Sequence, residues 1–130
     1  MTDFVHLHLH TEYSLLDGAC SIHRKAGEEH SPLIARALEL GQKSLAITDH
    51  GVMFGVIDFY RECKAAGIHP VIGCEVYTAP RTMRDKTHEY DSRANHLVLL
   101  AKNQTGYKNL MKIVSLAHTE GFYIKPRCDT

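Results

Sequence analysis

The fold class follows from one stretch, residues 44–78, which reads SLAITDHGVMFGVIDFYRECKAAGIHPVIGCEVYT. A short apolar run at 44–48 predicts a strand, and a helical pattern follows from about Gly55 to Ala66, with Gly67 as its stop. Residues 71–78 are rich in β-branched and aromatic side chains, which predicts a second strand. This strand–helix–strand order is typical of α/β proteins with a parallel sheet and right-handed crossovers.

Upstream, residues 4–10 alternate strictly between apolar and imidazole side chains, which predicts a strand with His6, His8 and His10 on one face. Residues 11–30 are polar and irregular. Ser31-Pro32 then supplies an N-cap and a proline at the first helical position, and Gly41 offers a stop, so a helix is expected between them.

Downstream, residues 80–95 are charged and aperiodic and predict an exposed loop, and residues 97–100 predict a buried strand. A helix is expected over 105–118, and no structure is expected after Gly121. The apolar faces of the two later helices would be formed by Val56, Tyr60 and Cys63, and by Tyr107, Leu110, Met111, Val114 and Ala117.

Composition bounds the possible functions. A chain of 130 residues with 44% hydrophobic and 23% charged residues suits one globular domain and excludes general disorder. Fifteen basic and fifteen acidic residues cancel, which argues against a surface that coats nucleic acid non-specifically. No apolar stretch is long enough to cross a bilayer, so no membrane association is expected. Four widely spaced cysteines without a C-x-x-C pair favour free thiols in a reducing cytoplasm.

Polar side chains gather where the predicted strands begin or end. His8 and His10 close the first strand, Asp49 and His50 follow the second, and Asp17 lies in the first long loop. Glu75 lies within the third strand and His96 opens the fourth. Imidazoles and carboxylates are ligands of zinc, manganese and iron, so the pattern indicates a metal cluster at the carboxyl edge of the sheet.

Each of these residues also has a simpler interpretation. A His-x-His pair taken alone is more often solvated or satisfied within a half-buried surface, and His50 could be a turn residue. Glu75 is harder to dismiss, because a buried carboxylate without a partner is costly. His6 is assigned to packing or to hydrogen bonding behind the ligands. The remaining histidines are expected on the surface: His23, His30, His69, His88 and His118.

The cysteines are expected to serve as small buried hydrophobic groups or to lack a partner at ligand spacing. No Ser-His-Asp arrangement and no glycine-rich nucleotide loop is present in the sequence. Hydrolysis by metal-activated water is the chemistry that these residues favour.

Five short motifs together resemble the PHP (polymerase and histidinol phosphatase) domain family: His8-Leu9-His10-Thr11, Leu16-Asp17-Gly18, Thr48-Asp49-His50-Gly51, Gly73-Cys74-Glu75 and Asn95-His96-Leu97. Longer phrases are similar to the amino terminus of the bacterial DNA polymerase III alpha subunit family: residues 6–18, 54–60 and 120–123. The resemblance covers essentially all of the chain.

The resemblance implies a distorted β/α barrel with divalent metal ions, zinc or manganese, at its carboxyl rim. The implied metal ligands, through which catalysis would occur, are His8, His10, Asp17, His50, Glu75 and His96, and Asp49 would orient His50 from behind. The implied activity is phosphodiester cleavage, with 3′ to 5′ proofreading as the candidate role. The implied partners are DNA and other replisome subunits, reached through a full-length DNA-directed DNA polymerase.

The family takes further ligands from later strands, and this chain stops at Thr130 before them. We therefore expect residues 1–130 to hold roughly the first half of the barrel and to be inactive alone. Cys128 does not lie in the expected motif and is not assigned as a ligand. Two alternatives stay open: a stand-alone phosphoesterase of the histidinol-phosphatase type, and a domain in which metal serves only stability.

Overall fold

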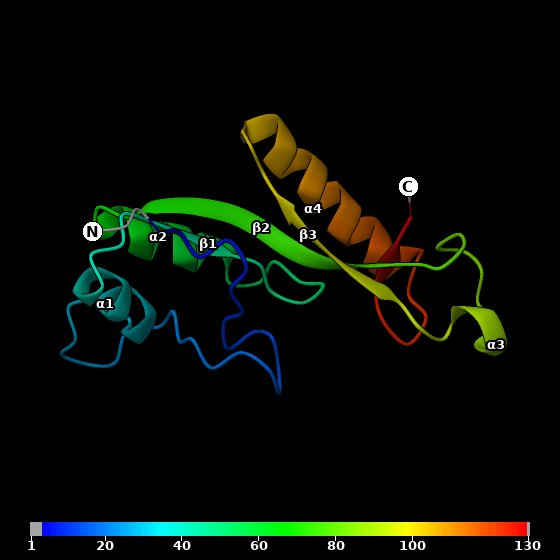
Figure 1. The fold of residues 1–130 in the computed structure, drawn as a ribbon, viewed down its shortest axis with the longest axis horizontal. Helices are drawn as coiled ribbons and strands as arrows, with labels where there is room; N and C mark the ends of the chain where they lie inside the picture. The colour runs from blue at the N-terminus through cyan, green and yellow to red at the C-terminus, as the bar shows by residue number, and fades with distance from the viewer. Residues whose placement is uncertain (1–3, 130) are drawn as a thin grey trace.

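A computed structural model describes residues 4–129, so residues 1–3 and Thr130 of the predicted 1–130 domain lie outside the described residues. The chain is mixed α/β with a partial sheet, which confirms the predicted fold class (Figure 1). Its elements are α1 (Pro32–Glu39), β1 (Ser44–Ile47), α2 (Val56–Ala65), β2 (His69–Thr78), α3 (His88–Asp91), β3 (Asn95–Leu100), α4 (Gln104–Thr119) and β4 (Arg127–Cys128).

The long strand β2 organises the sheet, because every other strand pairs with it. Along one edge, its residues 69–72 pair in parallel with β1, and its residues 77–78 pair in parallel with β4. Between these two ladders, an isolated parallel bridge joins His50 to Glu75. The opposite edge, residues 73–78, pairs with β3. Glu75 thus lies in the most fully paired part of the sheet.

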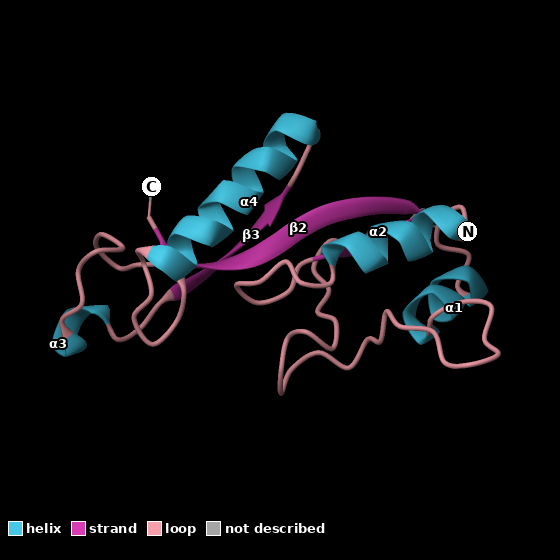
Figure 2. Ribbon diagram, turned by 180° about the vertical axis from the view of Figure 1, so that it is seen from behind, coloured by secondary structure: helices cyan, strands magenta, loops and turns pink. Residues whose placement is uncertain are grey.

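The two faces of β2 have different surroundings. Ile72, Cys74 and Val76 face the helices: Ile72 packs on the cluster formed by α1, α2 and β1, whereas Cys74 and Val76 pack against α4. Because side chains alternate along a strand, Glu75 and Tyr77 point to the other face. Figure 2 shows α2 and α4 lying along the strands on the helical face. The site residues therefore occupy the face that these helices leave open.

Local sequence signals explain the helix boundaries. Pro32 begins α1 directly after Ser31, whose side chain makes no capping hydrogen bond, contrary to the prediction. The Asn103 side chain caps α4 by accepting a 2.9 Å hydrogen bond from Gly106 N. The buried face of α2 contains Phe59, which is 0% exposed, and leaves Tyr60 47% exposed. Val56 and Cys63 lie on the buried face as predicted, whereas the prediction of Tyr60 on that face was wrong and Phe59 takes its place.

Three predictions about the sheet were wrong. Residues 97–100, expected to form a buried strand, belong to β3, in which Leu97 is 48% and Leu100 is 39% exposed. The sheet is not wholly parallel, since β3 runs antiparallel to β2. Residues 4–10 form no regular strand, although they run alongside β1, where Ala46 N donates to His6 O at 3.0 Å and Thr48 N donates to Leu9 O at 2.9 Å. Between these two hydrogen bonds the amino-terminal segment advances three residues, from His6 to Leu9, whereas the other segment advances two, from Ala46 to Thr48. This mismatch prevents a continuous ladder.

A buried arginine joins the two segments that were expected to lack regular structure, residues 80–95 and the tail after Gly121. Residues 80–95 contain the short helix α3, and the tail forms β4. Arg127 of β4 is 0% exposed and donates to four backbone oxygens, those of Gly121, Asp91, Met83 and Asp85, at 2.8–3.4 Å. This clamp connects the loop after β2 to the tail.

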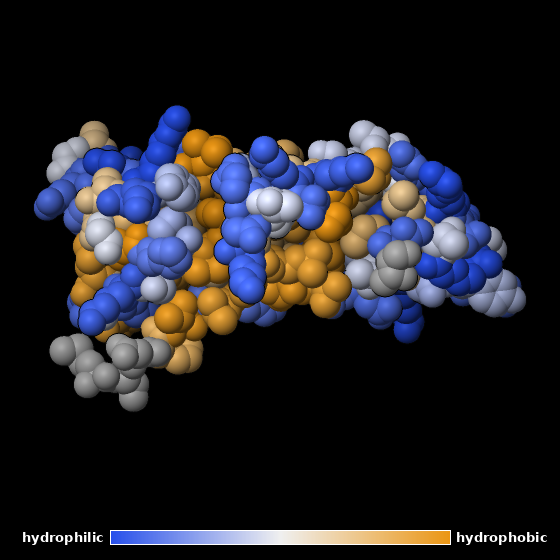
Figure 3. Space-filling model, turned by 90° about the horizontal axis from the view of Figure 1, so that it is seen from above, coloured by the Kyte–Doolittle hydropathy of each residue, from blue (hydrophilic) through white to orange (hydrophobic). Residues whose placement is uncertain are grey.

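The surface mixes polar ends with an apolar middle when seen from above (Figure 3). Several large apolar side chains are exposed by half or more, among them Leu15, Leu16, Phe54 and Phe122. Within residues 4–129, no helix combines the length and the apolar character that a bilayer crossing needs. The four thiols are unpaired, and burial raises the pKa of both Cys63 and Cys74 to about 12.

Candidate metal centre

Glu75 is the common partner of the candidate ligands. Its Oε2 contacts His8 Nε2 and lies 2.6 Å from His10 Nε2, and its Oε1 lies 2.7 Å from His96 Nδ1. Burial raises the pKa of Glu75, but the hydrogen bonds with the three imidazoles outweigh this effect and lower the pKa to about 2. The carboxylate is therefore ionised, and both of its oxygens face nitrogen donors.

Asp17 extends the cluster towards solvent. Its Oδ2 lies 2.8 Å from His50 Nε2 and 2.5 Å from His10 Nδ1. These hydrogen bonds, with that from His50 the larger cause, lower the pKa of Asp17. His10 therefore has one ring nitrogen facing Glu75 and the other facing Asp17.

The donors form three overlapping groups, each with its ligand atoms within 4.8 Å of one another. The groups are His8, His10 and Glu75; His10, Asp17 and His50; and His50, Glu75 and His96. The structure thus brings together all six residues that the motifs singled out. Neutral imidazoles and carboxylates are ligands that divalent ions prefer, so each group could hold such an ion.

His50 provides the observation that tests whether this donor set fits a metal. Its Nδ1 is buried and has no hydrogen-bond partner among residues 4–129, and Glu75 Oε2 is 3.7 Å away. A buried ring nitrogen without a partner is unfavourable unless something else satisfies it. A cation between His50 and Glu75 would do so, and the residues therefore fit a metal ion.

Asp49 supports the cluster from behind. Its carboxylate accepts from Thr11 N at 2.6 Å, from Thr11 Oγ1 at 2.7 Å and from Ser14 Oγ at 2.7 Å. Ser14 Oγ in turn accepts from His50 N at 3.1 Å. The described contacts therefore connect Asp49 to His50 through Ser14 and the His50 backbone, whereas the sequence suggested direct orientation of the ring.

The antiparallel orientation of β3 explains how His96 reaches this site. In the register of the two strands, His96 pairs with Tyr77, so the start of β3 lies beside the carboxyl end of β2. In a parallel arrangement, the start of a strand would lie at the opposite edge of the sheet. The expectation that His96 joins the cluster and the expectation of a parallel sheet could not both hold.

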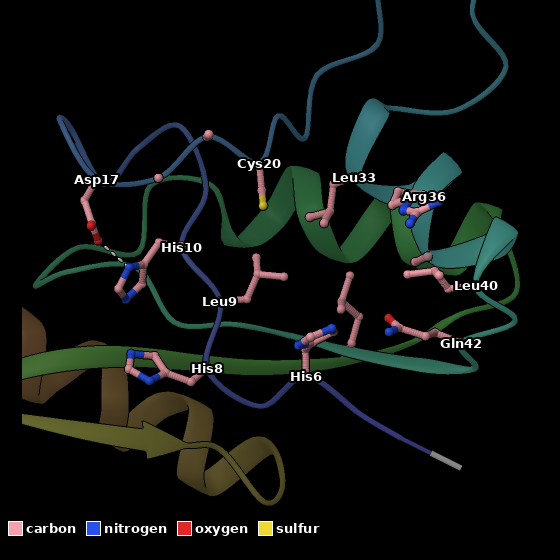
Figure 4. A pocket seen from close by; sticks show the side chains of 14 residues that line it. His6, His8, Leu9, His10, Asp17, Cys20, Leu33, Arg36, Leu40 and Gln42 are labelled. Carbon is pink, nitrogen blue, oxygen red and sulfur yellow. Dashed lines mark ion pairs between the residues drawn. The ribbon is translucent and has the colours of Figure 1, made fainter. Parts of the chain in front are cut away.

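A cavity of about 430 Å³ lies between residues 6–10 and α1 (Figure 4). His8 and His10 lie near Asp17 at one end of it, whereas His6 lies towards the Gln42 end. The His6 ring packs edge-on against Phe4, with centroids 4.7 Å apart. His6 is exposed, so its assignment to packing or to hydrogen bonding behind the ligands stays a prediction.

Two further residues at the site were not identified from the sequence. The Tyr77 ring stacks on His50, with centroids 6.0 Å apart, and meets His96 edge-on at 4.9 Å. Burial is the main cause that raises the pKa of Tyr77, and the charges of Glu75 and Asp17 add to it. His118 is exposed, as expected, and its Nε2 lies 2.8 Å from Gly51 O, so that it also supports the loop that carries His50.

The comparisons with known proteins cover almost the whole of this chain. A family model described as the PHP domain matches residues 6–130. The DNA polymerase III subunit alpha of Treponema pallidum (strain Nichols) is 51% identical over 127 residues, which are 97% of this chain and 10% of that protein. The subunit of the same name from Aquifex aeolicus (strain VF5) is 47% identical over 133 residues, covering 98% of this chain and 11% of that protein. The chain thus spans about a tenth of the length of the curated relatives it matches.

A solved structure supports the fold. An amidohydrolase from Chromobacterium violaceum with bound SO4 and no metal superposes with a TM-score of 0.51 at 23% sequence identity. The match covers 84% of this chain and 32% of that one. At this identity the likeness establishes the arrangement of helices and strands alone.

Proposed function

This chain belongs to the PHP domain family, and from that premise we propose that it is the amino-terminal segment of a bacterial DNA polymerase III alpha subunit with a metal-dependent phosphodiesterase site. The proposed reaction is removal of nucleotides from a 3′ end, which would serve proofreading during replication. The cytoplasm, DNA and other replisome subunits are the corresponding location and partners.

The convergence of six donor side chains into three overlapping groups, two of which contain Glu75, carries the proposal. We propose that His8, His10, Asp17, His50, Glu75 and His96 hold divalent ions, zinc or manganese. Such ions supply Lewis acidity and lower the pKa of water, so that a hydroxide nucleophile is available near neutral pH. The same positive charge would balance the two carboxylates of the site.

The chain's own residues would prepare this centre. The imidazoles of His8, His10 and His96 keep Glu75 ionised, and those of His50 and His10 do the same for Asp17. Asp49 and Ser14 hold the His50 backbone, while the Tyr77 ring restricts the motion of His50 and His96. Preorganised ligands of this kind are worth 10- to 100-fold in metal affinity, as an order of magnitude.

The test uses the full-length protein, purified with zinc or manganese. A 5′-labelled single-stranded DNA is incubated with wild type, with and without a chelator, and with His10→Ala. His69→Ala is the matched control, because His69 is an exposed histidine at the far end of β2. We expect 3′-end shortening that the chelator and His10→Ala abolish and that His69→Ala leaves unchanged.

A structural role is the second candidate, and one observation favours it. The cluster joins four segments that are distant in sequence, residues 8–17, His50, Glu75 and His96. A metal there would hold the amino-terminal segment to the sheet without any reaction. Retained metal and metal-dependent thermal stability without DNA shortening, in wild type, would support this role and contradict the nuclease.

A further inference from the structure

A cavity of about 460 Å³ opens directly onto the candidate metal centre. Asp17, His50 and His96 line one part of it, and the rest includes Leu15, Tyr77 and Lys125, none of which belongs to the donor set. A substrate that reaches the centre through this cavity would contact both groups of residues. Leu15, Tyr77 and Lys125 can therefore determine which substrates bind in this cavity.

Lys125 brings a positive charge to this cavity. Its Nζ lies 5.5 Å from the centroid of the Tyr77 ring, and the same ring contacts His50 and His96. Within residues 4–129, no carboxylate lies within ion-pair distance of Lys125. An ammonium group supported by an aromatic ring and free of an acidic partner is available to an anion.

The backbone around Lys125 forms a tight turn that lies next to the loop containing His50. Ile124 has φ 63°, and Tyr123 N donates to Lys125 O at 3.0 Å, which closes a tight turn. Gly51 allows this turn to approach His50, because a Cβ at Gly51 would lie 2.9 Å from Tyr77 Cε2 and 3.0 Å from Pro126 Cγ. The position of Lys125 is therefore coupled to the loop that carries His50.

The opposite side of the cavity has a matching feature. Leu16 has φ 66°, and within residues 4–129 it and Ile124 are the only non-glycine residues with positive φ. Leu16 directly follows Leu15, as Ile124 directly precedes Lys125, so both strained turns adjoin residues that line this cavity. Backbone strain in bulky residues persists where the surrounding structure imposes it, and it concentrates at functional sites. Leu15 is 83% exposed, so its apolar side chain is available for contact.

We propose that Lys125 and Leu15 form a substrate subsite for a nucleotide ester, in which the Lys125 ammonium binds the phosphate and the Leu15 side chain packs against the adjoining nucleoside. The proposal rests on the proposed function, since it places the substrate of the same centre. An ammonium donates strong hydrogen bonds to phosphate oxygens, and an exposed apolar group favours contact with the face of a base.

The experiment uses the full-length protein with Lys125→Ala, Lys125→Arg and Leu15→Ser, and with Lys102→Ala as the control at a lysine in a different cavity. Binding of thymidine 5′-monophosphate is measured by calorimetry. Hydrolysis is measured with the p-nitrophenyl ester of thymidine 5′-monophosphate, with methyl p-nitrophenyl phosphate, and with the uncharged methylphosphonate analogue of the thymidine ester. Metal content is measured for every variant.

We expect Lys125→Ala to weaken thymidine 5′-monophosphate binding and to raise KM for both charged esters about tenfold, the scale of one charge-assisted hydrogen bond. The metal content, kcat and the KM of the methylphosphonate should stay unchanged, and Lys125→Arg should recover most of the loss. Leu15→Ser should raise KM for the thymidine ester but not for the methyl ester. A purely structural role would not produce this dependence on charge and nucleoside.

Unchanged binding and unchanged KM in Lys125→Ala would overturn the proposal, as would a loss equally large for the uncharged analogue. Absence of hydrolysis in wild type would contradict the proposed function instead. In that case, weaker binding of thymidine 5′-monophosphate by Lys125→Ala, but not by Lys102→Ala, would still support the subsite.

Discussion

Glu75 shows how one side chain can organise a site. It is 5% exposed, lies on the most fully paired strand and has a nitrogen donor near each of its oxygens. A carboxylate in this position must stay charged to attract metal ions, and the surrounding imidazoles lower its pKa to about 2. Its charge, more than its size, is therefore the property on which the candidate centre depends.

Replacement of Glu75 by Gln tests this dependence, since the amide keeps the shape and removes the charge. We expect Glu75→Gln in the full-length protein to lower the bound zinc or manganese measured by elemental analysis after dialysis by at least one ion per chain. Glu39→Gln is the control, because Glu39 is an exposed residue at the end of α1. Equal metal content in the two variants would contradict the assignment.

Ser14 gives a second test at this scale. It is 3% exposed, and its hydroxyl accepts from His50 N and donates to Asp49. Ser14→Ala would leave a buried N–H and a buried carboxylate each short of one partner, so we expect a loss of about 2 kcal/mol in the free energy of unfolding. Urea titration measures it, with the exposed Ser115→Ala as control. A loss of unfolding free energy no larger than that of Ser115→Ala would show that the hydrogen bonds of Ser14 with His50 and Asp49 do not contribute to stability.

The sequence could single out six candidate donors because metal-binding chemistry uses few side-chain types at characteristic strand ends, and their role as ligands stays a proposal. All six donors named from the motifs lie together in the structure. Tyr77 and His118 were missed because each looks ordinary in sequence: an aromatic residue in a strand and a histidine near a helix end. Their roles depend on packing between segments, which one sequence does not reveal.

At the scale of elements, the clamp formed by Arg127 is the least expected feature. A fully buried guanidinium on four carbonyl oxygens connects β4 to the loop after β2 and to α3. Sequence patterns missed it, since a single arginine in a polar tail predicts an exposed side chain. The orientation of β3 was missed for a related reason, because strand direction depends on the path of the connecting loop.

Arg127→Met should therefore be costly. The substitution keeps the aliphatic stem but leaves several buried carbonyls without donors, and we expect a loss of about 3 kcal/mol in the free energy of unfolding. Arg93→Met, at an exposed arginine between α3 and β3, should change the free energy of unfolding by less than about 0.5 kcal/mol. Chemical denaturation of both variants measures the difference, and similar values would refute the clamp.

The lowered pKa of Asp91 in α3 predicts that the free energy of unfolding depends on pH. Hydrogen bonds from Arg81 lower the pKa of Asp91 below its ordinary value of 3.8, although burial acts in the opposite direction. The folded state therefore favours the ionised form, and this contribution to stability is complete above the ordinary pKa and is lost as the pH falls below it.

Asp91→Asn should consequently be less stable than wild type near pH 7, and the gap in unfolding free energy should narrow as the pH falls below about 4. Denaturant titrations of both proteins from pH 7 to pH 3 provide the measurement. Asp58→Asn, on the first turn of α2, serves as the control. A gap that stays constant over this range would contradict the ion pair of Asp91 with Arg81.

At the scale of the whole molecule, the candidate centre links segments that the backbone alone holds weakly. Residues 4–10 form no regular strand and few backbone hydrogen bonds hold them to β1, so the contacts of His8 and His10 with Glu75 add to their attachment to the sheet. A ligand that binds only the folded state stabilises it by about 2.7 kcal/mol at 100 times its dissociation constant.

Zinc or manganese should therefore raise the thermal midpoint of the full-length protein's amino-terminal unfolding transition by about 10 °C, and a chelator should reverse the change. Differential scanning calorimetry measures it. His10→Ala should show almost none of this increase, whereas His69→Ala should behave like wild type. An equal increase in both variants would mean that the ions act elsewhere.

The central place of β2 has a consequence for the order of events during synthesis. Glu75 meets His8 and His10 across 67 and 65 residues of chain, and His96 across a further 21. Closing such long loops is slow compared with forming local helices. A growing polypeptide therefore leaves the ribosome with its first histidines exposed and unmatched, and it acquires its full set of donors only after β3 has emerged.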